Sequence, residues 1–135
     1  NVTFIYRNDR NIFVQDSTSG MLIYDNSTPV ITNTYAEGDV ISGGLCGTYT
    51  LYNGLSEFIP TRATAAATVH HGAITPTVVT LAELNANYSQ YQAKLVKVKG
   101  ATFAAGTYTT NSASNISIDQ NGTSGVCRNH FKTLN

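Results

Sequence analysis

The sequence predicts a small all-β domain with one short helix. Charged residues make up only 12% of the 135-residue chain, about half the usual share, and Thr, Ser and Asn supply much of the polarity. Segments rich in β-branched and aromatic residues recur between turns that contain Gly and Asn, and such side chains favour a pleated sheet over a helix. A chain of this length forms one domain, or one domain with a fragment of another.

The charge balance gives no overall field that would attract nucleic acid. Eight basic and eight acidic residues cancel, whereas neutralisation of phosphates by basic residues normally supplies most non-specific affinity. Acidic residues prevail in 1–62 and basic residues in 63–135, so a nucleic-acid surface would have to be local. No signal peptide or run long enough to span a membrane is recognisable. A strand is already under way at Asn1, so we expect that targeting segments have been removed.

The first hairpin is predicted over Asn11–Asp25. Two apolar runs flank a turn rich in Ser, Thr and Gly, which is typical of paired strands. We expect Asp16 to accept hydrogen bonds from N–H groups of the turn, and Gly20 to adopt the positive φ that closes it. Residues 2–6 form a further strand before this hairpin.

A second hairpin is predicted around Asn53-Gly54, because a type I′ turn needs positive φ at both positions. A two-residue loop fixes the register as Tyr52 opposite Leu55, Thr50 opposite Glu57, and Tyr49 opposite Phe58. Gly43, Gly44 and Gly47 interrupt the first strand of this hairpin, which indicates a bulge or a sharp bend.

The remaining chain begins with a helix and returns to strands. Thr80 and Glu83 form a capping box, and apolar spacing predicts a short helix over 81–91. A strand follows over 93–103. Residues 115–119 then repeat the pattern of 11–16. The sequence therefore predicts a domain at 1–75, and at 76–135 a short helix followed by strands that either open a partial second copy or complete the first barrel.

The string Asn11–Asp25 resembles strands 2 and 3 of OB-folds, in which a turn of the form aromatic-hydrophobic-Gln-Asp-x-Thr-x-Gly recurs. Tyr35–Gly43 is similar to the entry into strand 4, and Tyr52–Phe58 is similar to the strand 4–5 hairpin of one branch of these folds. That branch comprises extracytoplasmic OB-fold-like domains of Bacteroidetes surface lipoproteins and of secreted nucleases. The resemblance covers residues 1–62 and, more loosely, 94–135. It implies an OB-fold-like small barrel located in the periplasm or on the cell surface.

The same resemblance implies a ligand surface outside strands 2 and 3, rimmed by the loops between strands 1 and 2 and between strands 4 and 5. Stacking aromatics beside arginines are typical of such surfaces. The candidate ligand-binding residues are Arg7, Arg10, Phe13, Gln15, Tyr24, Tyr52 and Asn53. Phe13 faces outward if Ile12 and Val14 face inward. The orientation of Tyr24 stays open, since Met21 with Ile23 and Leu22 with Tyr24 are equally good inward sets. Ordinary sheet packing and a solvated turn are alternative explanations for these residues.

Two functions are compatible with this resemblance, and neither is enzymatic. The first is a binding module for single-stranded nucleic acid or an oligosaccharide. The alternative is a structural spacer or protein-docking repeat of a cell-surface lipoprotein with no small ligand. In that case we expect the face with Phe13 and Gln15 to be covered by a neighbouring copy or by the helix at 81–91.

Motifs for catalysis or metal binding are not recognisable. The sequence has no nucleophile elbow, no Ser-His-Asp order and no phosphate-binding loop. His70, His71 and His130 lack the spacing of metal ligands, so we expect no metal and no cofactor. Cys46 and Cys127 either pair or remain free thiols.

Overall fold

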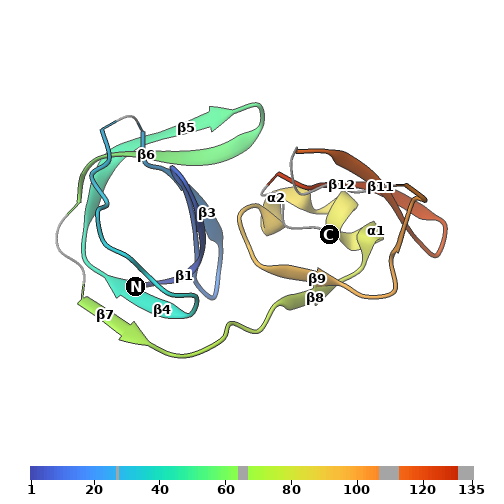
Figure 1. Ribbon diagram of the computed structural model, residues 1–135, viewed down its shortest axis with the longest axis horizontal. Coiled ribbons are helices and arrows are strands. Elements are labelled where there is room, and N and C mark those ends of the chain that lie inside the picture. Colours follow the sequence, from blue (N-terminus) through green and yellow to red (C-terminus); the bar gives the residue numbers. More distant parts are fainter. Residues whose placement is uncertain (27, 64–66, 107–112, 131–135) are drawn as a thin grey trace. The chain divides into compact units, whose positions relative to one another are not determined.

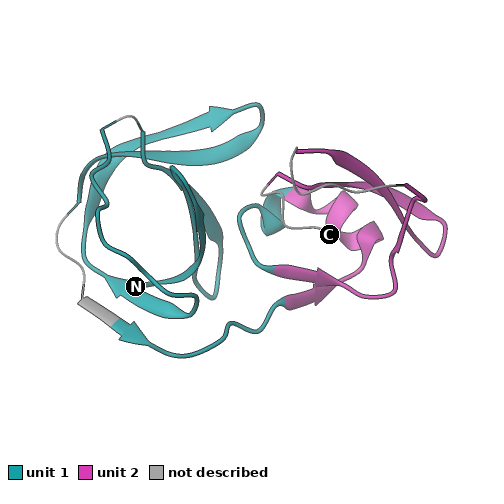
Figure 2. Cartoon of the chain, viewed as in Figure 1, with its two compact units in different colours: residues 1–76, 89–95 teal, residues 77–88, 96–135 magenta. Residues whose placement is uncertain are grey.

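The computed structural model describes residues 1–26, 28–63, 67–106 and 113–130. Strands dominate this part of the chain (Figure 1), which confirms the all-β prediction. Two short helices, α1 (Leu81–Ala86) and α2 (Tyr88–Tyr91), replace the single helix expected over 81–91. The chain divides into unit 1, residues 1–76 and 89–95, and unit 2, residues 77–88 and 96–135 (Figure 2).

Unit 1 is built on one strongly curved sheet of seven strands (Figure 1). The strands are β1 (Val2–Asn8), β2 (Asn11–Gln15), β3 (Gly20–Tyr24), β4 (Asp39–Ser42), β5 (Leu45–Tyr52), β6 (Leu55–Ala63) and β7 (Ala67–His70). Their order is β5-β6-β3-β2-β1-β4-β7, and only the β3–β6 pair is parallel. In the described part of the chain β5 and β7 are the edges, so strand pairing does not close this sheet into a barrel.

The core of unit 1 lies on one face of the sheet. It consists of Phe4, Ile12, Val14, Ile23 and Ile31. Since Ile12 pairs with Ile23 and Val14 with Met21, Met21 and Ile23 are the inward set, and Leu22 and Tyr24 face the opposite side. Each buried aliphatic side chain of this kind contributes about 1.5–3 kcal/mol.

The turn of the first hairpin is held by Asp16, as predicted. One carboxylate oxygen accepts hydrogen bonds from the Thr18 N–H at 2.7 Å, the Thr18 hydroxyl at 2.7 Å and the Ser19 N–H at 2.8 Å. These bonds, that of the Thr18 hydroxyl first, lower the pKa of Asp16 to about 2. The prediction for Gly20 is wrong, because Gly20 is not among the positive-φ residues and pairs with Gln15 within the sheet.

The second hairpin has the predicted turn and register. Asn53 and Gly54 have φ values of 51° and 82°. The predicted pairs are all present, namely Tyr52–Leu55, Thr50–Glu57 and Tyr49–Phe58. Gly43, with φ of 140°, lies between β4 and β5. At this break the chain leaves its pairing with β1 and begins its pairing with β6.

Asp25 organises the connection after β3. Its side chain is only 1% exposed, and its two carboxylate oxygens accept hydrogen bonds from the N–H groups of Val30 at 2.9 Å and Ile31 at 3.0 Å. A buried carboxylate is tolerated where such bonds replace its hydration. Asp25 thereby fixes the backbone from which Ile31 enters the core.

Unit 2 contains a parallel strand pair and a three-stranded sheet. The pair is β8 (Thr77–Val79) with β9 (Val96–Val98), and the sheet is β10 (Thr102–Phe103), β11 (Asn115–Gln120) and β12 (Thr123–Arg128). The strand predicted over 93–103 is thus divided, with Gly100 at φ of 69° in the gap. The Thr80 hydroxyl caps α1 as predicted, accepting from the Glu83 N–H at 3.1 Å.

The three-stranded sheet of unit 2 repeats the register of β1, β2 and β3. In unit 1 Thr3 and Phe4 oppose Gln15 and Val14, and in unit 2 Thr102 and Phe103 oppose Asp119 and Ile118. Every pair between β2 and β3 has a counterpart between β11 and β12, displaced by 104 positions. The hydrogen bond from the Asp25 N–H to Arg10 also recurs, from Asn129 to Ser114, at 2.8 Å in both cases.

Candidate functional site

The outer face of unit 1 is the side of β1, β2, β3 and β6 opposite the core; it comprises Tyr6, Phe13, Gln15, Leu22, Tyr24 and Glu57. The strand register places Tyr6, Phe13, Leu22 and Glu57 in one row across the four strands. Leu22 is only 2% exposed and Glu57 only 9%. The middle of the face that the sequence marks as a ligand surface is therefore removed from solvent.

Residues 89–95 belong to unit 1 and form what we call the cover segment. The Leu95 N–H donates to the side-chain oxygen of Gln15 at 2.9 Å. The Lys94 ammonium donates to the Thr18 carbonyl at 2.7 Å. The side-chain oxygen of Gln15, one of the candidate ligand-binding residues, is thus engaged by the chain itself.

Gln92 ties the cover segment to β6. Its side-chain oxygen accepts from the Ser56 N–H at 3.2 Å, and its side-chain nitrogen donates to the Gly54 carbonyl at 2.9 Å. In the described residues β3 pairs with β6 at Glu57 and Phe58, so the Gly54 carbonyl and the Ser56 N–H lie just beyond the end of this pairing. The amide of Gln92 therefore takes the place of a peptide group in a neighbouring strand.

Gly20 is required by the close approach of the cover segment. A Cβ at this position would lie 2.6 Å from the Ala93 carbonyl carbon and 2.6 Å from the Gln92 carbonyl oxygen, both backbone atoms. Contacts that short do not occur without displacement of one backbone. The glycine that the sequence assigns to a turn conformation is in fact a packing glycine.

The predicted site residues fall into separate groups. Phe13 and Tyr24 lie half-buried on the outer face. Arg10 is exposed in the turn after β1, 4.0 Å from the Asp9 carboxylate. Arg7 lies opposite Ile12, on the core side, and donates to the Ile31 carbonyl at 3.1 Å. The structure does not bring Arg7 to the face that carries Phe13.

Tyr52 and Asn53 lie at the end of an exposed arm, the β5–β6 hairpin. Three large side chains of β5 are mostly exposed, Tyr49 at 57%, Leu51 at 63% and Tyr52 at 64%. The Ser56 N–H donates to Gln92 and therefore points away from β5. Leu51 and Ser56, which face each other across the hairpin, thus form a pair without mutual backbone hydrogen bonds. The Leu51 N–H consequently points away from β6, toward the outer edge of β5. The alternation of apolar residues gave no indication that both faces of this strand would be exposed.

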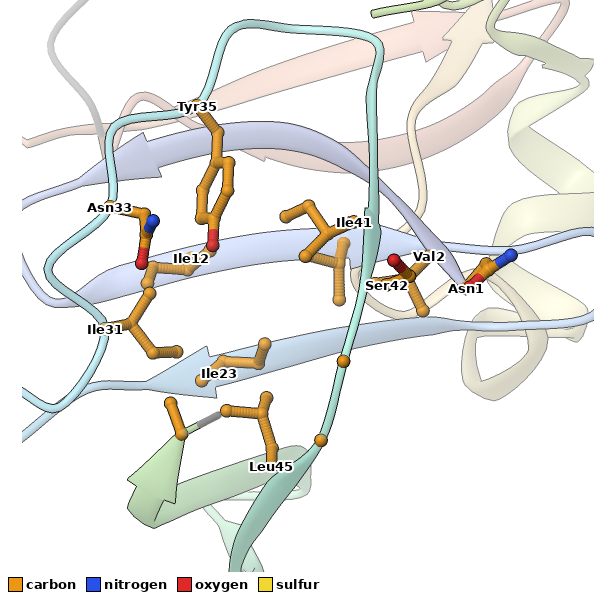
Figure 3. Close-up of a pocket in the computed structure, with 14 residues that line it drawn as sticks. Asn1, Val2, Ile12, Ile23, Ile31, Asn33, Tyr35, Ile41, Ser42 and Leu45 are labelled. Atoms are coloured by element: carbon orange, nitrogen blue, oxygen red, sulfur yellow. The ribbon is translucent and has the colours of Figure 1, made fainter. Parts of the chain in front are cut away.

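A cavity of about 200 Å³ lies on the core side of unit 1, and its walls include Ile12, Ile23, Ile31 and Ile41 (Figure 3). Tyr35 extends over it from the connection between β3 and β4, and its ring packs on Phe4 with centroids 5.7 Å apart. No feature of the sequence indicates this cavity, because core side chains form its walls.

The described residues contain no group of three His, Cys, Asp or Glu side chains that could hold a metal ion. His70 instead bonds Asp39 at 2.7 Å through Nδ1. The Ala36 N–H first, and His70 second, lower the pKa of Asp39. Both cysteines are free thiols.

In the part of the chain that the structure describes, no helix has the length and hydropathy needed to cross a membrane. No family model, curated protein or solved structure matches the chain.

Proposed function

We propose that the chain is a non-enzymatic, OB-fold-like module of an extracytoplasmic surface protein, and that it acts as a protein-docking repeat. The strand order of unit 1 supports the OB-fold part. If β4 and β5 are the two halves of one strand bent at Gly43, the sheet runs from β1 through β2, β3 and β6 and returns through that strand to β1. This is the arrangement of a partly open five-stranded barrel.

The matching registers of the two units support the repeat. The constant displacement of 104 positions between β2–β3 and β11–β12 is expected if 94–135 contains the opening strands of a second copy. The proposal therefore keeps the division into an OB-fold-like domain at 1–75 and a partial second repeat within 76–135. The surface-lipoprotein location rests on the resemblance of Asn11–Asp25, Tyr35–Gly43 and Tyr52–Phe58.

The observation that carries the docking role is the unprotected edge of β5. Edge strands normally carry Lys, Pro or bulges that discourage pairing with another chain. β5 includes no charged residue and no proline. Its register with β6 is irregular between Cys46 and Gly47, but Thr48–Tyr52 pairs regularly with β6, and the large side chains of this stretch are exposed. An added strand would satisfy its free N–H and C=O groups and bury Tyr49 and Leu51. A second copy fits this role, because two β5 strands related by a two-fold axis meet without charge repulsion.

Single-stranded nucleic acid or an oligosaccharide is the second candidate ligand. Tyr52 favours it, since its side chain is 64% exposed and a tyrosine ring can stack on a base or a sugar. The bond between Gln15 and the cover segment and the neutral net charge speak against tight binding.

Sedimentation equilibrium of wild type, Leu51→Pro and Leu51→Thr tests the docking role. We expect a reversible dimer that Leu51→Pro weakens by about tenfold, because proline removes the outward N–H that pairs with the second copy. Leu51→Thr keeps the N–H and serves as the matched control with a smaller effect. A wild type that stays monomeric, or equal effects of the two variants, would contradict the proposal.

Titration of labelled single-stranded DNA at low salt separates the two candidates. Binding that Tyr52→Ala abolishes, in a chain that remains monomeric, would support the nucleic-acid role and reject the docking role. A dimer with no DNA binding would support docking.

A further inference from the structure

The cavity of unit 1 has the form of a ligand site rather than a packing defect. Its walls combine buried core residues of β2 and β3 with residues of β1, of β4 and of the Gly43–Gly44 bend (Figure 3). Gly43 and Gly44, which have no side chains, form part of this lining and are exposed. The cavity therefore extends from the core to the surface.

Its size limits what can enter. An apolar cavity of about 150 Å³ holds a benzene-sized molecule. The present cavity, at about 200 Å³, accommodates a single ring with a short substituent, or a short alkyl chain. It is too small for a nucleotide or an oligosaccharide, so it is distinct from the surfaces discussed above.

The Tyr35 hydroxyl is directed into the apolar interior of the cavity (Figure 3). Figure 3 shows the Tyr35 ring entering from above, with its hydroxyl directed toward Ile12. Burial raises the pKa of Tyr35, against a smaller effect of Arg7, so the hydroxyl stays protonated near neutral pH and is available as a donor.

We infer that this cavity binds a small uncharged ligand, a hydrocarbon ring or short chain that carries one hydrogen-bond acceptor. The Ile and Val walls bind the hydrocarbon part, and the Tyr35 hydroxyl donates to the acceptor. None of the side chains that line the cavity is Asp, Glu, Lys or Arg, and the nearby Arg7 guanidinium already donates to the Ile31 carbonyl, so the walls offer a charged ligand no ion pair to replace its hydration. A few placed polar groups in an apolar concavity are typical of small-molecule sites.

Methyl NMR of the isoleucine-labelled chain tests this inference with acetophenone as the probe. Ethylbenzene has nearly the same shape without the acceptor, and benzoate adds a charge. We expect acetophenone to shift the methyl signals of Ile12, Ile23 and Ile31, and to bind about 2 to 10 times more tightly than ethylbenzene, as one net hydrogen bond implies. In Tyr35→Phe this difference should vanish while both probes still bind, and benzoate should not bind.

Filling the cavity provides the second variant. Ala63 lines it, so Ala63→Leu should abolish the methyl shifts, whereas Ala73→Leu at an exposed position should leave them unchanged. The inference is overturned if acetophenone shifts none of these methyl signals in the wild type, or if the shifts survive in a folded Ala63→Leu variant. Equal affinity for acetophenone and ethylbenzene would overturn the role of Tyr35.

Discussion

Gly20→Ala is expected to lower the free energy of unfolding of unit 1 by about 1–3 kcal/mol, the usual cost of forcing extra atoms into a packed site. The new methyl carbon would lie 2.6 Å from backbone atoms of Gln92 and Ala93, and a backbone cannot move aside as a flexible side chain can. We expect the cover segment to be displaced, with loss of its bonds to Gln15 and Thr18. Urea unfolding of the two proteins measures the change.

Gln92→Ala provides the control for this effect. It removes the two bonds to the Gly54–Ser56 backbone without creating a clash. If both substitutions act by releasing the cover segment, the double variant should lose less stability than the two losses added together. A Gly20→Ala protein as stable as the wild type, or more stable, would show that the cover segment does not pack against β3.

Asp25→Ala should cost about 2–4 kcal/mol, because the buried Ile31 N–H and the part-buried Val30 N–H lose their acceptor. A fully buried unsatisfied group costs about 1–3 kcal/mol, and a part-buried one costs less because water can reach it. Ile31 would also lose the backbone anchor that places it in the core. Urea unfolding again measures the loss. Asp25→Asn keeps one acceptor oxygen at the same place and should lose about half as much. Equal losses for the two variants would refute this account of the Asp25 carboxylate.

Features that depend on neighbouring residues were predictable from the sequence. The Asn53-Gly54 turn determines its own register, because both residues tolerate positive φ. Asp16 bonds groups two and three residues away. Thr80 likewise caps a helix through the residue three positions ahead. In each case the interacting groups are adjacent in the chain, so no tertiary information is needed.

Features that depend on distant segments were not predictable. Gln15 and Leu95 are 80 positions apart, and nothing in either segment indicates that they meet. Gly20 was misread for the same reason, since its neighbour lies in the cover segment. Arg7 was assigned to the loop after the first strand, whereas it lies within β1 opposite Ile12 and donates to the Ile31 carbonyl, 24 positions away.

The alternation of apolar and polar residues along the strands predicted part of the candidate site. Because Ile12 and Val14 face the core, Phe13 between them was correctly predicted to face outward. Tyr24 could not be placed until the pairing of Ile12 with Ile23 selected between two equally apolar sets. Alternation identifies faces of a strand, whereas the coverage of a face depends on the rest of the chain.

Hydrogen exchange of the Leu95 amide tests most directly whether the cover segment occupies the outer face. We predict that this amide exchanges far more slowly than an unstructured one, because it is bonded to Gln15. In Gln15→Met, which keeps the shape but loses the acceptor, it should accelerate while the Ile23 amide in β3 stays protected. Exchange of Leu95 at the unprotected rate in the wild type would mean that the outer face is open, and would contradict the account.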